Sequence, residues 1–370
     1  MTVPKLCPKS FSSIPVPLEL SGSEQRYRYL KFVEVAGTVI VDTIEGMFMY
    51  FMFRNLAGWR PTIRMALLSM MWICSSSLLV AQDEATAENP AKACSSEHKK
   101  DEAKVGKFVF KTYLSSDGAC LEVIRLGKTI LRSPRDSHCP YSLGQHEDKV
   151  SKIPAIANGT DLTGSGRPEM IISGYTGGAH CCTEHDIYEL EPQFKRLVTI
   201  DDADDEDGHF EDMDHDGHYF HLTYDPTFVY WNASYADSQH TRVILQFVND
   251  SKGGAFHLAL KKMHEPVPSP EEWKETTKVA REAFGADNPF SGGIGSWFWG
   301  NMLSLIYAGH SDLAWKLSDE TWPPKKPGKD KFLADFCSQL KTSPYWPDLE
   351  PTVQGAPPAC ADAEPDHTGR

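Results

Sequence analysis

The stretch Asp212-Met-Asp-His-Asp-Gly-His-Tyr-Phe220, followed by His221-Leu-Thr223, decides how this chain is interpreted. Carboxylates stand at its first, third and fifth positions, and a glycine at the sixth allows a sharp turn. Such a loop can wrap a hard cation with side-chain and main-chain oxygens, of which calcium takes about 6 to 8. The predicted calcium ligands are the side chains of Asp212, Asp214 and Asp216 and the carbonyl oxygen of His218.

A related loop begins 51 residues earlier in the chain. It consists of Asp161-Leu-Thr-Gly-Ser-Gly-Arg-Pro-Glu169 and precedes the apolar run Met170-Ile-Ile172. A spacing of this size is near the period of one blade of a β-propeller. The candidate calcium ligands in this loop are Asp161, Thr163, Ser165 and Glu169.

The pattern Asp-x-Asp-x-Asp-Gly before a strand resembles the calcium loop of FG-GAP and VCBS repeats, which occur in integrin-type propellers and in many secreted bacterial proteins. The stretch Asp161 to Cys182, with Thr227-Phe-Val-Tyr-Trp231 further on, is similar to a group of exported bacterial proteins that carry such repeats. The resemblance covers about residues 105 to 345. It implies a β-propeller-like fold and a binding role, and it implies no activity.

Both loops depart from that family pattern. The acid at the ninth position is present as Glu169 in the first loop, but Phe220 takes its place in the second. The first loop also has Thr163 and Ser165 where the family has acids. Calcium binding and a loop held by hydrogen bonds alone, as Asx-turns are, therefore stay open for each loop.

The predicted fold is mainly β, with propeller-like repeats and a C-terminal helical subdomain. Short runs rich in β-branched and aromatic residues alternate with Gly, Pro, Asp and Asn from Lys107 to Leu260, and one predicted strand is Phe228-Val-Tyr-Trp231. At Ser269-Pro-Glu-Glu272 the pattern changes to a capping box with proline at the first helical position. The predicted organisation is a linker over 82–104, a β-rich repeat domain over 105–265, a helical subdomain over 266–346 and a disordered tail over 347–370.

An export signal is predicted over residues 65–81. Arg60 and Arg64 precede an apolar, uncharged run that ends in Leu79-Val80-Ala81, the order expected of a cleavable leader. The run is shorter than the roughly 20 residues that span a bilayer, so cleavage is favoured over a membrane anchor. Residues 1–64 stand before this leader, and we expect Met65 to be the true start. The alternative is a long targeting extension.

Export predicts a periplasmic or secreted protein with no membrane contact after cleavage. Without its first 81 residues the chain keeps 29 basic and 46 acidic residues, a net charge of −17. This charge argues against a nucleic-acid partner and fits cation binding. The predicted partner is a protein or a cell-surface ligand. The acidic run from Asp201 to Gly208 is interpreted as a solvated loop rather than as a source of further ligands.

In an oxidising compartment the cysteines become disulfide candidates. Among the seven that follow the leader, the simplest local pairings are Cys120 with Cys139 and Cys337 with Cys360. The stretch Gly177-Gly-Ala-His-Cys-Cys-Thr-Glu-His185 holds two adjacent thiols and two histidines. A structural disulfide is the favoured interpretation there; a zinc or copper site and a free or catalytic thiol are the alternatives.

The sequence therefore favours an exported binding or structural protein with calcium-loop-like β repeats and no assigned reaction. It contains no Gly-x-Ser-x-Gly elbow, no His-Glu-x-x-His helix and no phosphate-binding P-loop. An enzymatic role is not favoured. The alternative is an extracytoplasmic metal- or thiol-dependent hydrolase centred on His180, Cys181, Cys182 and His185.

Cleavage after Ala81 is a direct test of the predicted leader. We expect N-terminal sequencing and intact mass of the exported protein to place its first residue at Gln82. A first residue upstream of Met65, or a retained apolar run, would contradict the prediction.

Overall fold

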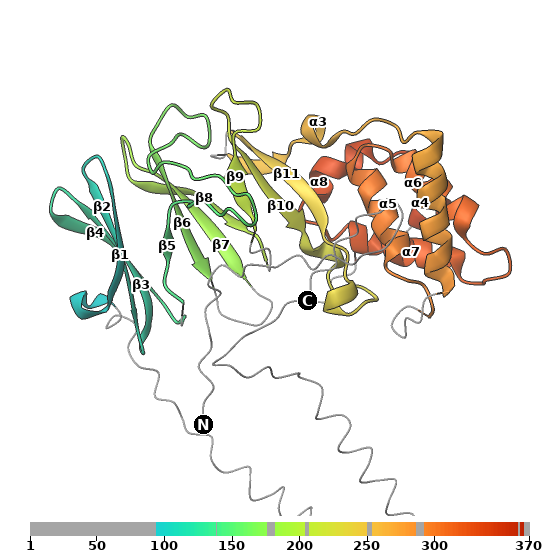
Figure 1. The fold of residues 1–370 in the computed structure, drawn as a ribbon, viewed down its shortest axis with the longest axis horizontal. Coiled ribbons are helices and arrows are strands. Elements are labelled where there is room, and N and C mark those ends of the chain that lie inside the picture. The colour runs from blue at the N-terminus through green and yellow to red at the C-terminus, as the bar shows by residue number, and fades with distance from the viewer. Residues whose placement is uncertain are drawn as a thin grey trace, which may run out of the picture. The chain divides into compact units, whose positions relative to one another are not determined.

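The computed structural model describes residues 94–137, 139–175, 182–203, 207–249, 254–285, 292–361 and 363–365. The predicted leader, the residues before it and residues 82–93 of the predicted linker lie outside these described residues, so export stays a prediction. Within the described part, three antiparallel sheets come first and a group of helices follows (Figure 1).

The first strand of the first sheet was not predicted from the sequence. Its strands are β1 (Lys99–Val105), β2 (Phe108–Ser115), β3 (Gly118–Arg125) and β4 (Lys128–Arg135), paired in that order. β1 lies almost entirely within the predicted linker. That segment was predicted as a linker because its residues are polar and show no apolar alternation, and in the structure they are mostly exposed. It takes the form of a strand by pairing with β2, where Val105 lies opposite Phe108.

The second and third sheets repeat this arrangement. The second contains β5 (Ser142–Leu143), β6 (Glu169–Tyr175), β7 (Thr183–Glu189) and β8 (Lys195–Asp201). The third contains β9 (His209–Glu211), β10 (Phe220–Asp225), β11 (Thr241–Val248) and β12 (Ala255–Leu258). In both, consecutive strands pair antiparallel. The three sheets do not close into a barrel or a propeller within the described residues, and the mainly-β prediction holds only for this part.

Both faces of the second sheet carry buried core residues, most completely on β6. Met170 and Ile172 on β6 belong to a core cluster that includes Phe110 of the first sheet. Ile171, between them, clusters with Phe210 of the third sheet. Successive residues of a strand point to opposite faces, so alternate residues of β6 contact different sheets. A strand buried on both faces is apolar without interruption, which explains the run Met170-Ile-Ile172.

Two disulfides link distant parts of the chain. Cys337 bonds to Cys360, which confirms that pairing. Cys120 bonds to Cys94 and not to Cys139. The short 3-10 helix Ser96–His98 contacts β2, and Cys94 packs against the buried Cys120 and Tyr113. Cys139 is also disulfide-bonded. These bonds are consistent with an oxidising compartment.

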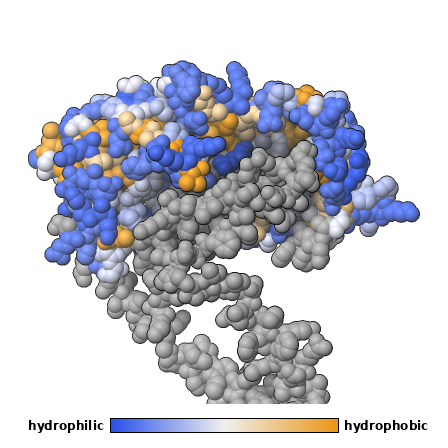
Figure 2. All heavy atoms as spheres, in the orientation of Figure 1, coloured by the Kyte–Doolittle hydropathy of each residue, from blue (hydrophilic) through white to orange (hydrophobic). Residues whose placement is uncertain are grey.

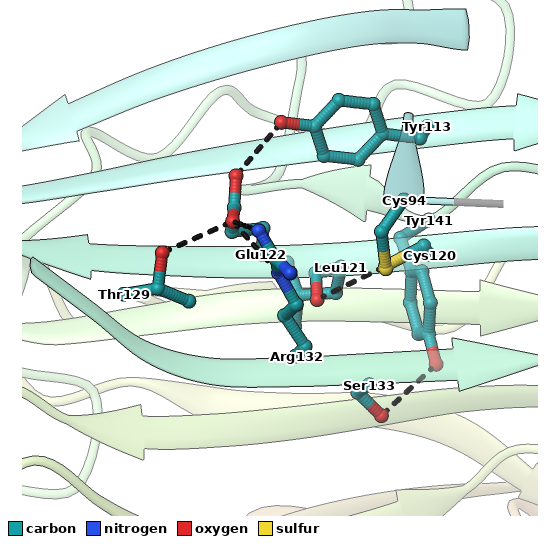
Figure 3. The surroundings of a disulfide bond; sticks show 9 residues. All are labelled: Cys94, Tyr113, Cys120, Leu121, Glu122, Thr129, Arg132, Ser133 and Tyr141. Carbon is teal, nitrogen blue, oxygen red and sulfur yellow. Dashed lines mark hydrogen bonds and ion pairs between the residues drawn. A yellow bond between two sulfur atoms is a disulfide. The ribbon is translucent and has the colours of Figure 1, made fainter. Parts of the chain in front are cut away.

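A buried carboxylate lies close to the Cys94–Cys120 bond (Figure 3). Glu122 accepts hydrogen bonds from the Tyr113 hydroxyl at 2.8 Å, from Thr129 at 3.1 Å and from two guanidinium nitrogens of Arg132 at 2.9 and 2.7 Å. Burial raises the pKa of this carboxyl, but the bonds from Arg132, Tyr113 and Thr129 outweigh that effect and hold it below its usual value. The carboxylate therefore joins β2, β3 and β4.

The helices come after the third sheet. They are α3 (Leu260–Met263), α4 (Pro270–Glu282), α5 (Trp297–Tyr307), α6 (Ser311–Thr321), α7 (Lys329–Leu340), α8 (Trp346–Leu349) and α9 (Pro358–Ala361). α4 starts with the predicted capping box between Ser269 and Glu272. α8 and α9 lie in or at the edge of the predicted disordered tail. The buried Cys360 of α9 is bonded to Cys337 of α7, and the described structure reaches residue 365.

A buried aspartate connects the third sheet to the helices. Asp225, only 4% exposed, ends β10 and caps the 3-10 helix Pro226–Phe228, which replaces part of the strand predicted at residues 228–231. One of its oxygens accepts the amide and hydroxyl of Thr227, and the other accepts the hydroxyls of Tyr307 on α5 and Ser343. Burial, followed by the charge of Asp225, raises the pKa of Tyr307 well above its usual value.

Hydrophilic residues cover most of the described surface that Figure 2 shows, and apolar residues form small scattered patches. Leu126, Val267 and Trp297 are among the large apolar side chains that are more than half exposed. Among the described helices, none combines the length and apolar character needed to cross a membrane.

The Asp225 contact makes a testable contribution to stability. We expect Tyr307→Phe to lower the free energy of unfolding by about 1–3 kcal/mol, because the buried carboxylate loses one donor while the ring stays in place. Denaturant unfolding followed by tryptophan fluorescence measures this change. Tyr230→Phe is the control, since Tyr230 is 55% exposed and its hydroxyl removal should change stability by less than about 0.5 kcal/mol. Equal stability of the two variants would contradict the prediction.

Candidate metal centre

Two histidines and one aspartate meet where the second and third sheets face each other. His185 lies on β7, Asp202 directly follows β8, and His221 lies on β10. One ligand atom from each side chain lies within 4.8 Å of the other two. The side chains of Asp202 and His221 are fully buried, and that of His185 is 12% exposed. We call these three residues the His-Asp-His cluster.

Strand register places the two histidines on facing surfaces. His185 is directly opposite Ser173 on β6. Ser173 is two residues after Ile171, so both point to the face of β6 that packs against the third sheet. His221 is directly opposite Phe210 on β9, and their ring centroids are 4.6 Å apart. Because side chains alternate along a strand, shifting either strand by one residue would remove its histidine from this contact.

The distances within the cluster are short. Nε2 of His221 lies 2.9 Å from each carboxylate oxygen of Asp202. Nε2 of His185 lies 3.0 Å from Oδ2 of Asp202, yet it makes no hydrogen bond within the described residues. Nδ1 of His185 lies 2.7 Å from the hydroxyl oxygen of Ser173. Nδ1 of His221 is buried and has no hydrogen-bond partner in the described part of the chain.

Electrostatics favour the metal-binding protonation states of Asp202 and His221. Burial raises the pKa of Asp202, but His221 and His185 outweigh this effect and hold it well below its usual value. The pKa of His221 is lowered, because full burial disfavours the imidazolium more strongly than Asp202 favours it. An ionised carboxylate and a neutral imidazole are the forms that bind metal ions.

The backbone around Asp202 leaves little room for it to move. The Asp202 amide donates to the carbonyl oxygen of Thr183 on β7 at 2.9 Å. On another side, a Cβ atom added to Gly208 would overlap Oδ2 of Asp202. The glycine thus allows the chain to pass close to the carboxylate, and any larger residue there would push Asp202 away from the two histidines.

The two aspartate loops have the same local structure. Asp161 accepts the amides of Ser165 at 2.9 Å and Gly166 at 2.6 Å. Asp212 accepts the amides at the same offsets, from Asp216 at 3.1 Å and Gly217 at 3.0 Å. The fourth and sixth residues of both loops have positive φ: Gly164, Gly166, His215 and Gly217. Each loop leads into the second strand of its sheet.

The remaining candidate ligands of the first loop are engaged with one another. Glu169 is 1% exposed and accepts the amides of Leu162 at 2.9 Å and Thr163 at 3.1 Å. It also accepts the hydroxyls of Thr163 and Ser165. Burial raises the pKa of Glu169. Hydrogen bonds therefore close this loop, and calcium binding here stays a prediction.

In the second loop the carboxylates have separate partners. Asp214 forms an ion pair with Lys262 at 2.5 Å, and Asp216 accepts the backbone amide of His218 at 3.0 Å. Phe220, in place of the ninth-position acid, is buried. Calcium binding at Asp212, Asp214 and Asp216 also stays a prediction, and it would require Lys262 to leave Asp214.

The motif with adjacent cysteines is only partly described. Residues 176–181, including His180 and Cys181, lie outside the described residues, whereas Cys182 is disulfide-bonded. His185 belongs to the His-Asp-His cluster. Sequence reasoning missed Asp202, because its acidic run suggested a solvated loop, and His221, because it stands inside a strand. A histidine at an inward-facing strand position was the available signal.

Comparison with protein-family models, curated proteins and solved structures finds no match. The FG-GAP/VCBS resemblance therefore depends on the loop residues themselves. A functional argument has to start from the local geometry of the two loops and of the His-Asp-His cluster.

Gly208 provides a test of how tightly Asp202 is held. We expect Gly208→Ala to lower the free energy of unfolding by about 1–3 kcal/mol, because the new Cβ overlaps the Asp202 carboxylate. The control is Gly285→Ala, since no atom lies within 4 Å of a Cβ at Gly285. Thermal and denaturant unfolding compare the two. If both variants have the same free energy of unfolding as the unchanged protein, Asp202 can move to make room for the new Cβ atom.

Proposed function

We propose that the protein is an exported binding or structural protein whose β part is a run of FG-GAP/VCBS-type repeats. The observation that carries this proposal is the shared structure of the two aspartate loops. They agree in hydrogen-bond offsets, in the positions of positive φ and in their place before the second strand of a sheet. The first residues of β6 and β10, Glu169 and Phe220, are also 51 positions apart.

Three consecutive four-stranded meanders support a propeller-like arrangement, because propeller blades are sheets of this kind. Burial of both faces of the second sheet fits a blade between two others. The first sheet would be a repeat without a calcium loop, since only Gly106 and Lys107 join β1 to β2. α5, which contacts β11, would cap the last repeat, as terminal elements do in repeat proteins.

Within this proposal the second loop is the calcium site. Asp212, Asp214 and Asp216 offer carboxylate oxygens and His218 a carbonyl oxygen, the hard ligands that calcium requires. A bound ion would neutralise these carboxylates and fix the start of β10. The first loop needs no ion to be ordered, because its hydroxyl groups already donate to Glu169. The partner would be a protein or a cell-surface ligand.

One observation favours the alternative of a metal-dependent hydrolase: His185, from the cysteine motif, lies in a group of metal-ligand side chains. Cys182 cannot be the nucleophile of a thiol-dependent hydrolase while it is disulfide-bonded. The burial of Asp202 and His221 leaves little access for a substrate. A binding role is therefore the stronger proposal.

Lys262 offers a sharp test of the calcium site, because its ion pair with Asp214 would compete with an ion for that carboxylate. We expect calcium to raise the melting temperature of the protein relative to a chelator. Lys262→Gln should bind calcium about 2–5-fold more tightly by titration calorimetry, since an exposed ion pair contributes about 0.5–1 kcal/mol. Asp212→Asn should abolish the response.

Lys261→Gln is the matched control, because it removes the same charge from the neighbouring residue of α3. An equal effect of Lys261→Gln and Lys262→Gln would indicate general electrostatics rather than competition for Asp214. No calcium response in any of these proteins would overturn the calcium site and leave two loops held by hydrogen bonds.

A further inference from the structure

We propose that His185, Asp202 and His221 bind one divalent transition-metal ion, and that zinc is the ion they fit best. Two imidazole nitrogens and one carboxylate form a donor set that zinc accepts. Calcium prefers oxygen ligands alone, so this site differs in chemistry from the aspartate loops. The proposal does not depend on the proposed calcium site.

Two of the three distances between ligand atoms are close to those of a metal site, and all three are within 4.8 Å. Zinc bonds of about 2.0–2.1 Å in tetrahedral geometry place neighbouring ligand atoms about 3.3 Å apart. The nitrogens of His221 and His185 lie 2.9 and 3.0 Å from Asp202 oxygens, so each pair has to separate by about 0.3–0.4 Å. An ion would replace the 3.0 Å contact between Nε2 of His185 and Oδ2 of Asp202, and this nitrogen has no other partner within the described residues.

The outer contacts of the histidines fit this assignment. A histidine that binds metal through Nε2 carries its proton on Nδ1 and donates it to a neighbouring acceptor. Nδ1 of His185 already lies 2.7 Å from the Ser173 hydroxyl, which can serve as that acceptor. Nδ1 of His221 has no hydrogen-bond partner in the described residues in either tautomer, and burying such an atom lowers stability. A bond between Nε2 of His221 and the metal would offset this loss.

Charge supplies the third argument. Asp202 is a fully buried carboxylate, and its ion-pair partners among the described residues are His185 and His221. No lysine or arginine pairs with Asp202 among the described residues, and burying a charge without a full counter-charge is expensive. A divalent cation between the three side chains would provide that counter-charge.

The ion would join two sheets. Two of its ligands come from the second sheet and its margin, and His221 comes from the third. Because such a site forms only in the folded chain, the binding free energy of the ion would add to the stability of the sheet stack. The burial of the cluster therefore assigns the ion a structural role.

Zinc titration of the exported protein tests the proposal, with disulfides intact, metals removed by a chelator and calcium present throughout. We expect one equivalent of zinc to bind and to raise the melting temperature. His185→Ala should weaken zinc binding by about 100-fold or more, and Ser173→Ala, which removes only the outer contact, by about 10-fold or more. His257→Ala is the control, because His257 is paired with Asp348 away from the cluster.

A measurement on the unmutated protein remains decisive even where a variant fails to fold. Ring-nitrogen NMR should show zinc moving the Nε2 signals of two histidines and fixing their protons on Nδ1. Failure of the protein to bind one equivalent of zinc would overturn the proposal. So would zinc binding that tolerates both His185→Ala and Ser173→Ala and leaves the buried histidine signals unchanged.

Discussion

The central strand β6 of the second sheet has to bury both of its faces, and most of the arrangement around it follows from that constraint. A strand such as β6 presents Met170 and Ile172 on one side and Ile171 on the other, so it is stable only between two other layers. A polar group buried in such a stack lowers stability unless it is paired. Gln145 meets this condition by exchanging two hydrogen bonds of 2.7 Å with the backbone of Phe210 on the next sheet.

Three buried carboxylates each join separate elements of the fold, and their environments differ. Glu122 joins three strands of one sheet and includes an arginine among its partners. Asp225 accepts four donors and fixes α5 and Ser343 to the third sheet. The ion-pair partners of Asp202 in the described residues are two imidazoles, with no arginine or lysine among them, which makes it the candidate site for a cation. A buried carboxylate is thus a structural contact where donors are plentiful and a binding candidate where counter-charge is short.

Much of the secondary structure could be predicted, because hairpin strands and capped helices carry local signals. The run Met170-Ile-Ile172 and the capping box at Ser269 are of this kind. β1 could not be predicted, since it is a polar edge strand that depends on β2, and the ordered end of the chain depends on the Cys337–Cys360 bond. The candidate calcium residues were found from spacing alone. Asp202 and His221 were not, because they become neighbours only when two sheets pack.

The aspartate loops show the boundary between these two kinds of information. Residue order by itself determined that Asp161 and Asp212 would each close a turn, because their oxygens accept amides only four and five residues away. Only the tertiary structure decided that Lys262 would occupy Asp214 and that His185 would meet His221 across a sheet interface. The physical reason is range: a loop of six residues is governed by local hydrogen bonds, whereas contacts between sheets depend on the register and burial of every strand in them.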